Sequence, residues 1–286
     1  MNGKRLVKQS SRGETTQKGG RNNNHNKEFP KVSYAFRKIV HILPVVPSRR
    51  RIKGFKKRLL VNWGDVKEIE IRAFETLNAF DLLTLLSITS YCLDSQLLDG
   101  GFYLDEHGKP ISRMYLAVTT KYGFVKNYRG LDPNQPRNIK LVYESILRLT
   151  GCLWIFRHVD GSCRILRILM NFKEKDEKWH FYVNRRYIDS IETDRKKFLK
   201  IILTYMRRCK TDIGKLLCYW LQGQVNTCFS EDTLVSALHL EYSRMDARKK
   251  LRKAFEDVRN AGYIKKWKEE EKHNVRYFWF EKEKNT

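Results

Sequence analysis

The C-terminal part of the chain contains MDARKKLRKAFEDVRNAGYI at residues 245–264, followed directly by KKWKEEEKHNVRYFWF at residues 265–280. The first stretch has the period of a helix, because at about 100° per residue its apolar side chains share one stripe. The members of this stripe are Ala247, Leu251, Ala254, Phe255 and Val258. The second stretch has strand-forming residues on both sides of a turn near 270–274, which is typical of a β-hairpin. We therefore predict a helix that ends at Gly262 and a hairpin after it.

Further helices are predicted upstream of this pair. One spans 211–222, begins at an N-cap formed by Thr211 or Asp212, and has one apolar face. The next follows a short TCF strand, where the sequence Ser-Glu-Asp at 230–232 caps the helix TLVSALHL. Another helix is predicted from about 194 to 208. The three helices from residue 211 onward are followed by the two-stranded hairpin. This is the order of a winged-helix module, a variant of the helix-turn-helix.

The first half of the chain repeats this order. The predicted elements are a strand pair at 61–73, a buried helix at 77–93, a turn-rich stretch at 99–108 and a helix at 136–151. A hairpin and a further strand follow the last of these helices. The predicted fold is therefore α+β, with two tandem winged-helix domains.

Charge is distributed unevenly along the chain. The 286 residues include 57 Lys and Arg against 32 Asp and Glu, which gives a formal net charge of +25. Residues 1–60 contain 17 basic and 2 acidic residues, residues 61–194 contain 18 of each, and residues 195–286 contain 22 basic and 12 acidic residues. A neutral middle between two basic ends predicts two electropositive surfaces for a polyanion, and nucleic acid is the first candidate.

Three parts of the chain are predicted from these patterns. Residues 1–60 form a basic, largely disordered extension, which would clamp phosphates or serve only as a solubilising tail. Residues 61–193 form the N-terminal winged-helix domain, with a role in dimerisation or auxiliary DNA contact. Residues 194–286 form the C-terminal winged-helix domain, which binds DNA.

Basic residues occupy the polar side of the long C-terminal helix and the hairpin after it. On the helix they gather in the N-terminal half, the part that contacts base edges in helix-turn-helix proteins. The residues predicted to contact DNA are Arg244, Arg248, Lys249, Arg252, Lys253, Lys265, Lys266, Lys268, Lys272 and Arg276. Such side chains can donate to guanine O6 and N7 or hold phosphates, and a solvated basic face is the alternative interpretation. Replacing Arg248 and Arg252 together by Ala is expected to leave the fold intact, since both lie off the apolar stripe.

Two features limit the predicted interface. Residues 269–271 are all Glu and are expected at the tip of the hairpin, where they would repel phosphate. The equivalent helix of the first half carries Glu144 among the auxiliary DNA-binding candidates, which are Arg137, Lys140 and Arg148. Its mixed charge is as compatible with docking of a partner as with contact to DNA.

Motifs for catalysis, cofactors and metals are missing from the sequence. No GxxxxGK[ST], GxGxxG or HExxH motif occurs, and the seven histidines include no His-x-His pair. The six cysteines form no C-x-x-C pair, which predicts reduced thiols and no zinc site. His273 and Arg276 have the spacing of a tyrosine-recombinase box, but a hairpin strand accounts for them better. We predict no enzyme activity, no cofactor and no metal.

A membrane location is not expected. The longest apolar stretch, residues 82–93, has 12 residues and is shorter than the roughly 20 that a membrane-spanning helix needs. The basic N-terminal residues are not followed by the apolar core of a secretory signal. We therefore predict a cytoplasmic protein that associates with DNA.

Two regions resemble a known family. They are FDLLTLLSITSY at 80–91 in the first half, and IGKLLCYWLQGQ at 213–224 through AGYIKKW at 261–267 in the second. Together with the tandem element order, they make residues 61–280 similar to the iteron-binding plasmid replication initiators, the Rep proteins built from two winged-helix domains. The resemblance implies binding of double-stranded DNA at the direct repeats of a plasmid origin. The second domain would make the main contacts, and the first would dimerise or contact the other end of the repeat.

The resemblance also implies partners. Bound monomers would help to melt an adjacent AT-rich segment and recruit the host replication initiator and the replicative helicase. Dimers would repress the initiator's own gene, so a monomer–dimer equilibrium is expected. The long basic extension and the acidic hairpin tip depart from the family pattern. Three other functions stay open from the sequence: a winged-helix transcriptional regulator, a nucleic-acid enzyme such as a nickase or recombinase, and an RNA-binding structural protein.

Overall fold

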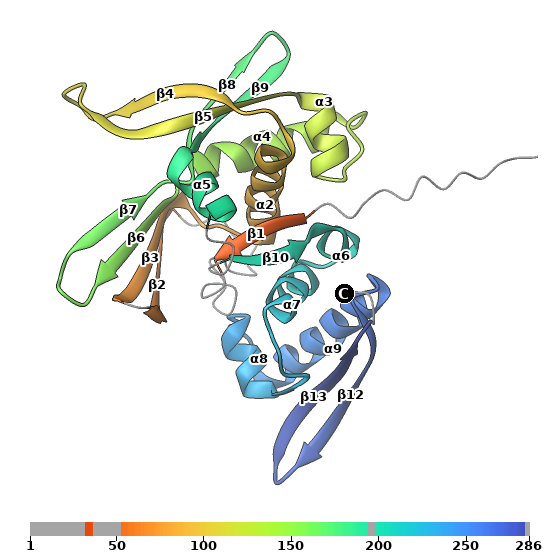
Figure 1. Ribbon diagram of the computed structural model, residues 1–286. Coiled ribbons are helices and arrows are strands. Elements are labelled where there is room, and N and C mark those ends of the chain that lie inside the picture. Colours follow the sequence, from red (N-terminus) through yellow and green to blue (C-terminus); the bar gives the residue numbers. More distant parts are fainter. Residues whose placement is uncertain (1–31, 37–52, 64, 194–197, 284–286) are drawn as a thin grey trace, which may run out of the picture.

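Residues 32–36, 53–63, 65–193 and 198–283 are described by the computed structural model of this chain, and Figure 1 shows their arrangement. Helices are interspersed with groups of antiparallel strands in this part, so the α+β class predicted from the sequence is confirmed. The first half contains two four-stranded antiparallel sheets, and the second half contains a three-stranded sheet.

The first sheet has the strand order β2-β3-β6-β7. Its strands are β2 (Lys53–Trp63), β3 (Val66–Glu75), β6 (Leu153–His158) and β7 (Cys163–Leu166). Side chains alternate along β3, which buries Ile69 and Ile71 on the inner face and places Glu68 and Glu70 on the outer face. The strand pair predicted at 61–73 is therefore present, and it begins earlier, at Lys53.

The second sheet has the strand order β4-β5-β9-β8. Its strands are β4 (Leu98–Leu104), β5 (Pro110–Thr120), β8 (Leu169–Lys175) and β9 (Lys178–Asn184). The prediction of turns over 99–108 was wrong, because most of this stretch is β4. Periodicity could not indicate this strand, since Leu98, Phe102 and Leu104 all remain exposed and β4 forms through backbone pairing with β5.

Two long helices of the first half confirm the predicted ones. They are α2 (Ala79–Asp94) and α4 (Pro136–Thr150). A capping box begins α2, in which the Asn78 side chain accepts from the Asp81 backbone N–H and the Asp81 carboxylate accepts from the Asn78 N–H. Shorter helical segments are α3 (Lys121–Gly123), η1 (Phe124–Tyr128) and α5 (Arg185–Thr193). The order α2, α4 and hairpin β6–β7 is that of a winged helix to which the second sheet has been added.

A two-stranded sheet joins distant parts of the sequence. Strand β1 (Val32–Phe36) pairs antiparallel with β10 (Phe198–Ile202), and α6 (Leu203–Arg208) follows β10. The helix predicted from 194 to 208 was therefore wrong over β10, because the partner strand lies far upstream in the sequence and local periodicity cannot reveal it. The prediction of a largely disordered extension over 1–60 was also wrong for β1 and for the part of β2 before residue 61. The remainder of 1–60 lies outside the described residues.

The C-terminal part has the predicted winged-helix order. Its elements are α7 (Asp212–Gln222), β11 (Cys228–Ser230), α8 (Glu231–Ala237), α9 (Arg244–Asn260), β12 (Ile264–Lys272) and β13 (Val275–Lys282). All five members of the predicted apolar stripe on α9 are buried. Thr211 caps α7 and Ser230 caps α8, as the sequence indicated. Gly262 follows α9 with a φ of +85°, a conformation that favours glycine.

The two halves touch through helices. In the described residues α2 of the first half contacts α6 and α7 of the second half. None of the helices in this part of the chain is long and apolar enough to cross a membrane.

Candidate nucleic-acid interface

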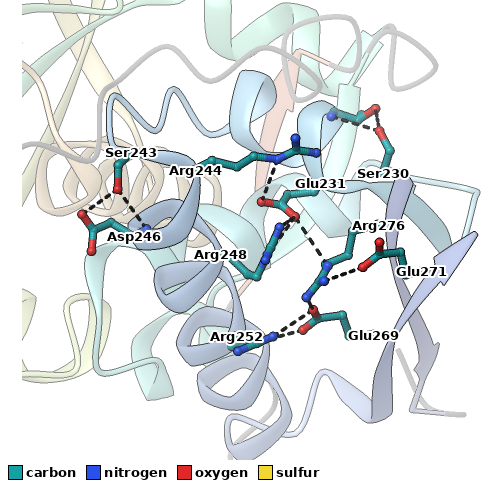
Figure 2. Close-up of polar contacts among 11 residues, drawn as sticks. Ser230, Glu231, Ser243, Arg244, Asp246, Arg248, Arg252, Glu269, Glu271 and Arg276 are labelled. Carbon is teal, nitrogen blue, oxygen red and sulfur yellow. Dashed lines mark hydrogen bonds and ion pairs between the residues drawn. The ribbon is translucent and has the colours of Figure 1, made fainter. Parts of the chain in front are cut away.

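Helix α9 turns its polar side away from the core. Ser243 fixes the start of the helix, because its Oγ accepts from the Asp246 N–H at 3.2 Å and donates to Asp246 Oδ2 at 2.8 Å. The buried stripe packs against the rest of the domain, so the basic residues of the first three turns face outward. Figure 2 shows Arg244, Arg248 and Arg252 extending from α9 towards α8 and the hairpin β12–β13.

A buried carboxylate holds the arginines of the first turns. Glu231, the first residue of α8, is only 1% exposed. The Arg248 guanidinium donates to Glu231 Oε2 from Nε at 3.1 Å and lies with Nη2 3.0 Å away (Figure 2). Arg244 Nε lies 4.0 Å from Oε1, and Arg276 Nε lies 3.9 Å from Oε2. A buried carboxylate needs such partners, and here they are three arginines from α9 and β13.

A second carboxylate connects α9 to the hairpin. Arg252 donates to both oxygens of Glu269, from Nε at 2.7 Å and from Nη2 at 3.0 Å. Arg276 also donates to Glu269, and its Nη2 donates to Glu271 Oε2 at 2.6 Å (Figure 2). The hydrogen bond from Arg252 holds the pKa of Glu269 below its usual value, and the same bond raises the pKa of Arg252. Hydrogen bonds to Glu271 and Glu269 raise the pKa of Arg276.

The expectation of an acidic hairpin tip was wrong. The turn is formed by His273 and Asn274, which have φ values of +51° and +62°. Glu269 and Glu271 lie before this turn, where they bind Arg252 and Arg276. Their charges therefore neutralise part of the basic interface, and they do not project beyond it.

Basic groups nevertheless remain available on this side of the domain. Arg252 has a 52% exposed side chain despite its two bonds to Glu269. Lys249 and Lys253 are exposed, and no ion pair involving them occurs among the described residues. We define the α9 face as Arg244, Arg248, Lys249, Arg252, Lys253 and Arg276.

The lysines of the hairpin that were predicted to contact DNA lie outside the α9 face. In the antiparallel register Trp267 faces Phe280 and Glu269 faces Phe278, and this side of the hairpin packs on Phe255 of α9. The residues of the opposite side include Lys266, Lys268 and Lys272. These lysines pair with Glu281 or Glu270, while Lys265, in the bulge that begins β12, lies 3.9 Å from Glu281. The predicted interface is therefore divided between two faces, and only Arg276 of the hairpin joins the α9 face.

Sequence reasoning missed two exposed residues beside this face. Met245, in the first turn of α9, is 78% exposed. Tyr242, just before the helix, is also exposed, and Lys250 Nζ lies 4.4 Å from its ring centroid. Met245 lies off the apolar stripe, so its position away from the core could have been found on the same helical wheel, whereas Tyr242 precedes the helix and gave no such signal. Apolar side chains at this end of a recognition helix can contact the methyl group of thymine.

The auxiliary candidates on α4 differ in their exposure. Arg148 binds Asp81 Oδ1 through Nε at 3.0 Å and Nη2 at 2.9 Å, and Ser145 Oγ donates to the same oxygen at 2.7 Å. Asp81 is fully buried and Arg148 is only 13% exposed, so this guanidinium belongs to the interior of the domain. Arg137 and Lys140 are exposed. The structure thus leaves two of the three predicted side chains accessible on α4.

Similarity to known proteins is found in the fold and not in the sequence. No protein-family model and no curated protein matches the sequence. Among solved structures, the fold is similar to that in the crystal structure of the Pi initiator protein in complex with iteron DNA, with a TM-score of 0.49 and 14% sequence identity. The match covers 82% of this chain and 99% of that chain.

Proposed function

We propose that this protein binds specific sequences of double-stranded DNA through the α9 face, with the N-terminal half of α9 in the major groove. One observation carries the proposal: Glu231 and Glu269 fix Arg248 and Arg252 on the polar side of a winged-helix recognition helix. A guanidinium has five N–H donors, so one bound carboxylate leaves other donors free for bases or phosphates. Holding the arginines in place lowers the entropy lost on binding.

The biological role that we propose is initiation of plasmid replication at direct repeats, together with repression of the protein's own gene. The tandem winged-helix order and the basic α9 face support this proposal, which rests for its finer parts on the family resemblance of the sequence. Those parts are recruitment of the host replication initiator and replicative helicase, a monomer–dimer equilibrium, and a dimerising or auxiliary N-terminal domain. We place this non-enzymatic role in the cytoplasm. A winged-helix transcriptional regulator would use the same face on DNA that does not support replication.

Fluorescence anisotropy with labelled duplexes tests DNA binding. The duplexes are tiled across the DNA that flanks the gene, and each is titrated at two salt concentrations with an excess of unrelated competitor DNA. Phosphate contacts weaken steeply with salt, whereas specific base contacts give a preference that survives competition. We expect one repeated segment to retain tight binding. Uniform, salt-sensitive binding to all duplexes would contradict the proposal.

A plasmid test separates the two biological roles. The preferred segment is cloned with the gene into a plasmid that lacks another origin. Autonomous replication supports the initiator, and failure to replicate combined with repression of a reporter supports the regulator. A nicked or covalently bound product, on incubation of the supercoiled plasmid with the protein and Mg²⁺, would instead favour an enzyme.

A further inference from the structure

A second set of basic side chains lies in the first half of the molecule, on the outer face of the sheet β2-β3-β6-β7. The antiparallel register places Lys56 opposite Arg72, Arg58 opposite Glu70, and Arg157 opposite Glu68. Directly opposed residues of neighbouring strands share a face, so all of these side chains lie on the same side of the sheet. The other side is the buried inner face.

The four cations converge on a single carboxylate. Glu70 is fully covered, with a side-chain exposure of 0%. Arg58 Nε lies 3.2 Å from its Oε2, Arg157 Nη2 lies 3.5 Å from the same oxygen, and Lys56 Nζ lies 3.5 Å from Oε1. Arg72 donates to Oε1 as well. Burial alone would raise the pKa of Glu70, but the hydrogen bond from Arg72 and the nearby positive charges outweigh it and lower the pKa.

The arrangement has more positive charge than a structural ion pair needs. Glu68 is the second carboxylate on this face, and its Oε1 lies 3.3 Å from Arg157 Nε. Among the described side chains, two carboxylates therefore face four cations, whose side chains are between 38% and 59% exposed. Opposite charges across neighbouring strands stabilise a sheet, but two carboxylates offset the charge of only two of the four cations. Here the excess charge and the outer N–H groups face solvent.

Apolar side chains surround the cations. Leu60 lies opposite Glu68 on the outer face, Phe74 follows Arg72 by two residues on β3, and Ile165 pairs with Ile155. The side chains of Leu60, Phe74 and Ile165 are each more than half exposed. A sheet surface that combines guanidinium groups with exposed apolar side chains can contact phosphates and pack against sugars or bases.

We propose that this surface, the Glu70 cluster of Lys56, Arg58, Arg72 and Arg157, is a second nucleic-acid site that binds backbone phosphates without selecting a base sequence. The site is distinct from the α9 face, and it rests on the function proposed above in that it gives the auxiliary DNA contact of the N-terminal domain a location. In Figure 1 the lower ends of β2 and β3 and the tip of the β12–β13 hairpin point to the same side of the view. The phosphates come from duplex DNA next to the specific site or from a melted single strand.

The test uses a charge-removing double variant, Arg58→Gln/Arg157→Gln, of the full chain. Both glutamines keep part of the side-chain stem, and Arg72 and Lys56 remain beside Glu70. The matched control is Lys175→Gln/Lys178→Gln, which removes two exposed cations from the β8–β9 turn of the other sheet. Circular dichroism and thermal melting verify that both variants are folded.

Binding is measured by anisotropy over a salt series with a labelled duplex of mixed sequence and a labelled single strand of the same length. Because the duplex carries no specific site, its binding reports phosphate contacts. The slope of log K against log salt concentration is negative, and its magnitude should decrease by about 0.9 for each duplex phosphate that the variant no longer neutralises. The affinity at low salt should fall roughly tenfold. The probe whose affinity falls further identifies the source of the phosphates. Identical slopes for the two double variants on both probes would overturn the proposal.

Three further variants keep the result interpretable. If the double glutamine variant does not fold, Lys56→Gln alone should lower the magnitude of the duplex slope by about 0.9. Arg58→Lys/Arg157→Lys keeps the charge and should retain most of the binding. The variant Lys249→Ala/Arg252→Ala, tested in parallel on the preferred duplex, reports on the α9 face. Failure of one site is thereby distinguished from failure of the other.

Discussion

Helices α9 and α4 occupy equivalent places in the two halves of the molecule, and both carry arginines that bind a carboxylate. On α9, Arg248 binds Glu231 yet keeps 26% of its side chain exposed, and neighbouring basic residues are more exposed still. On α4, Arg148 reaches inward to Asp81 in the first turn of α2, and only 13% of its side chain is exposed. The difference shows that the location of the carboxylate decides whether an arginine is enclosed in the core or keeps part of its side chain exposed.

The largest effect is expected from a variant that breaks the buried ion pair between Arg148 of α4 and Asp81. Arg148→Ala removes the guanidinium that donates two hydrogen bonds to the buried Asp81 carboxylate, so we expect the free energy of unfolding to fall by about 3 kcal/mol. Urea unfolding measures this decrease. Arg137→Ala, an exposed residue on the same helix, should change stability by no more than about 0.5 kcal/mol. Weaker DNA binding by a fully stable Arg148→Ala protein would contradict the structural role.

A smaller effect is expected for Arg248 on α9, because its guanidinium binds the buried Glu231 carboxylate. Arg248→Ala leaves Glu231 with Arg244 and Arg276 at 4.0 and 3.9 Å. We expect a decrease of about 2 kcal/mol in the free energy of unfolding, since a buried carboxylate loses its closest partner.

Arg252→Ala is the matched control for this prediction. Glu269 keeps Arg276 as a partner after the change, so stability should fall by no more than about 0.5 kcal/mol. Equal decreases for the two variants in urea unfolding would show that Glu231 does not depend on Arg248.

Met245 is a further difference between the two helices, because the first turn of α4 has no exposed large hydrophobic side chain. Met245→Ala should weaken binding to the preferred duplex by about 1 kcal/mol and leave binding to a mixed-sequence duplex unchanged. The matched control is Val225→Ala, another exposed apolar residue that lies outside α9. An equal weakening on both duplexes would exclude a base contact by Met245.

The smallest expected effect is on the pH dependence of stability. The hydrogen bond from Arg252 lowers the pKa of Glu269, so the ionised form stabilises the fold above the unfolded pKa of about 4.5. This contribution disappears as the pH falls through the lowered folded pKa. When the pH is lowered, the free energy of unfolding measured in urea should therefore decrease by about 0.5 kcal/mol less for Glu269→Gln than for the parent protein. Parallel curves for the two proteins would contradict the assignment.

Local signals in the sequence predicted much of the fold. The stripe on α9 and the caps at Thr211 and Ser230 depend only on residues within a few positions of one another, and all are present. Pairing of β10 with β1 depends on a strand far upstream, and no local pattern around residues 198–202 indicates it.

The candidate site was predictable to a similar extent. The basic face of α9 could be predicted, because the spacing of its Lys and Arg residues places them opposite the apolar stripe. The carboxylates that bind its arginines could not be predicted, because Glu231 and Glu269 come from α8 and β12. Arg148 was misassigned for the same reason, since Asp81 lies 67 residues earlier in the chain. Long-range contacts therefore decided which basic side chains remain free.

The most direct test of α9 as the sequence-specific helix compares two double variants that remove the same charge. Lys249→Ala/Arg252→Ala alters the α9 face, and Arg137→Ala/Lys140→Ala alters exposed residues of α4. For each, the affinity for the preferred duplex is divided by the affinity for a mixed-sequence duplex at one salt concentration. We expect the α9 variant to lower this ratio at least tenfold and the α4 variant to leave it unchanged. An unchanged ratio for the α9 variant, or a larger decrease for the α4 variant, would contradict the account.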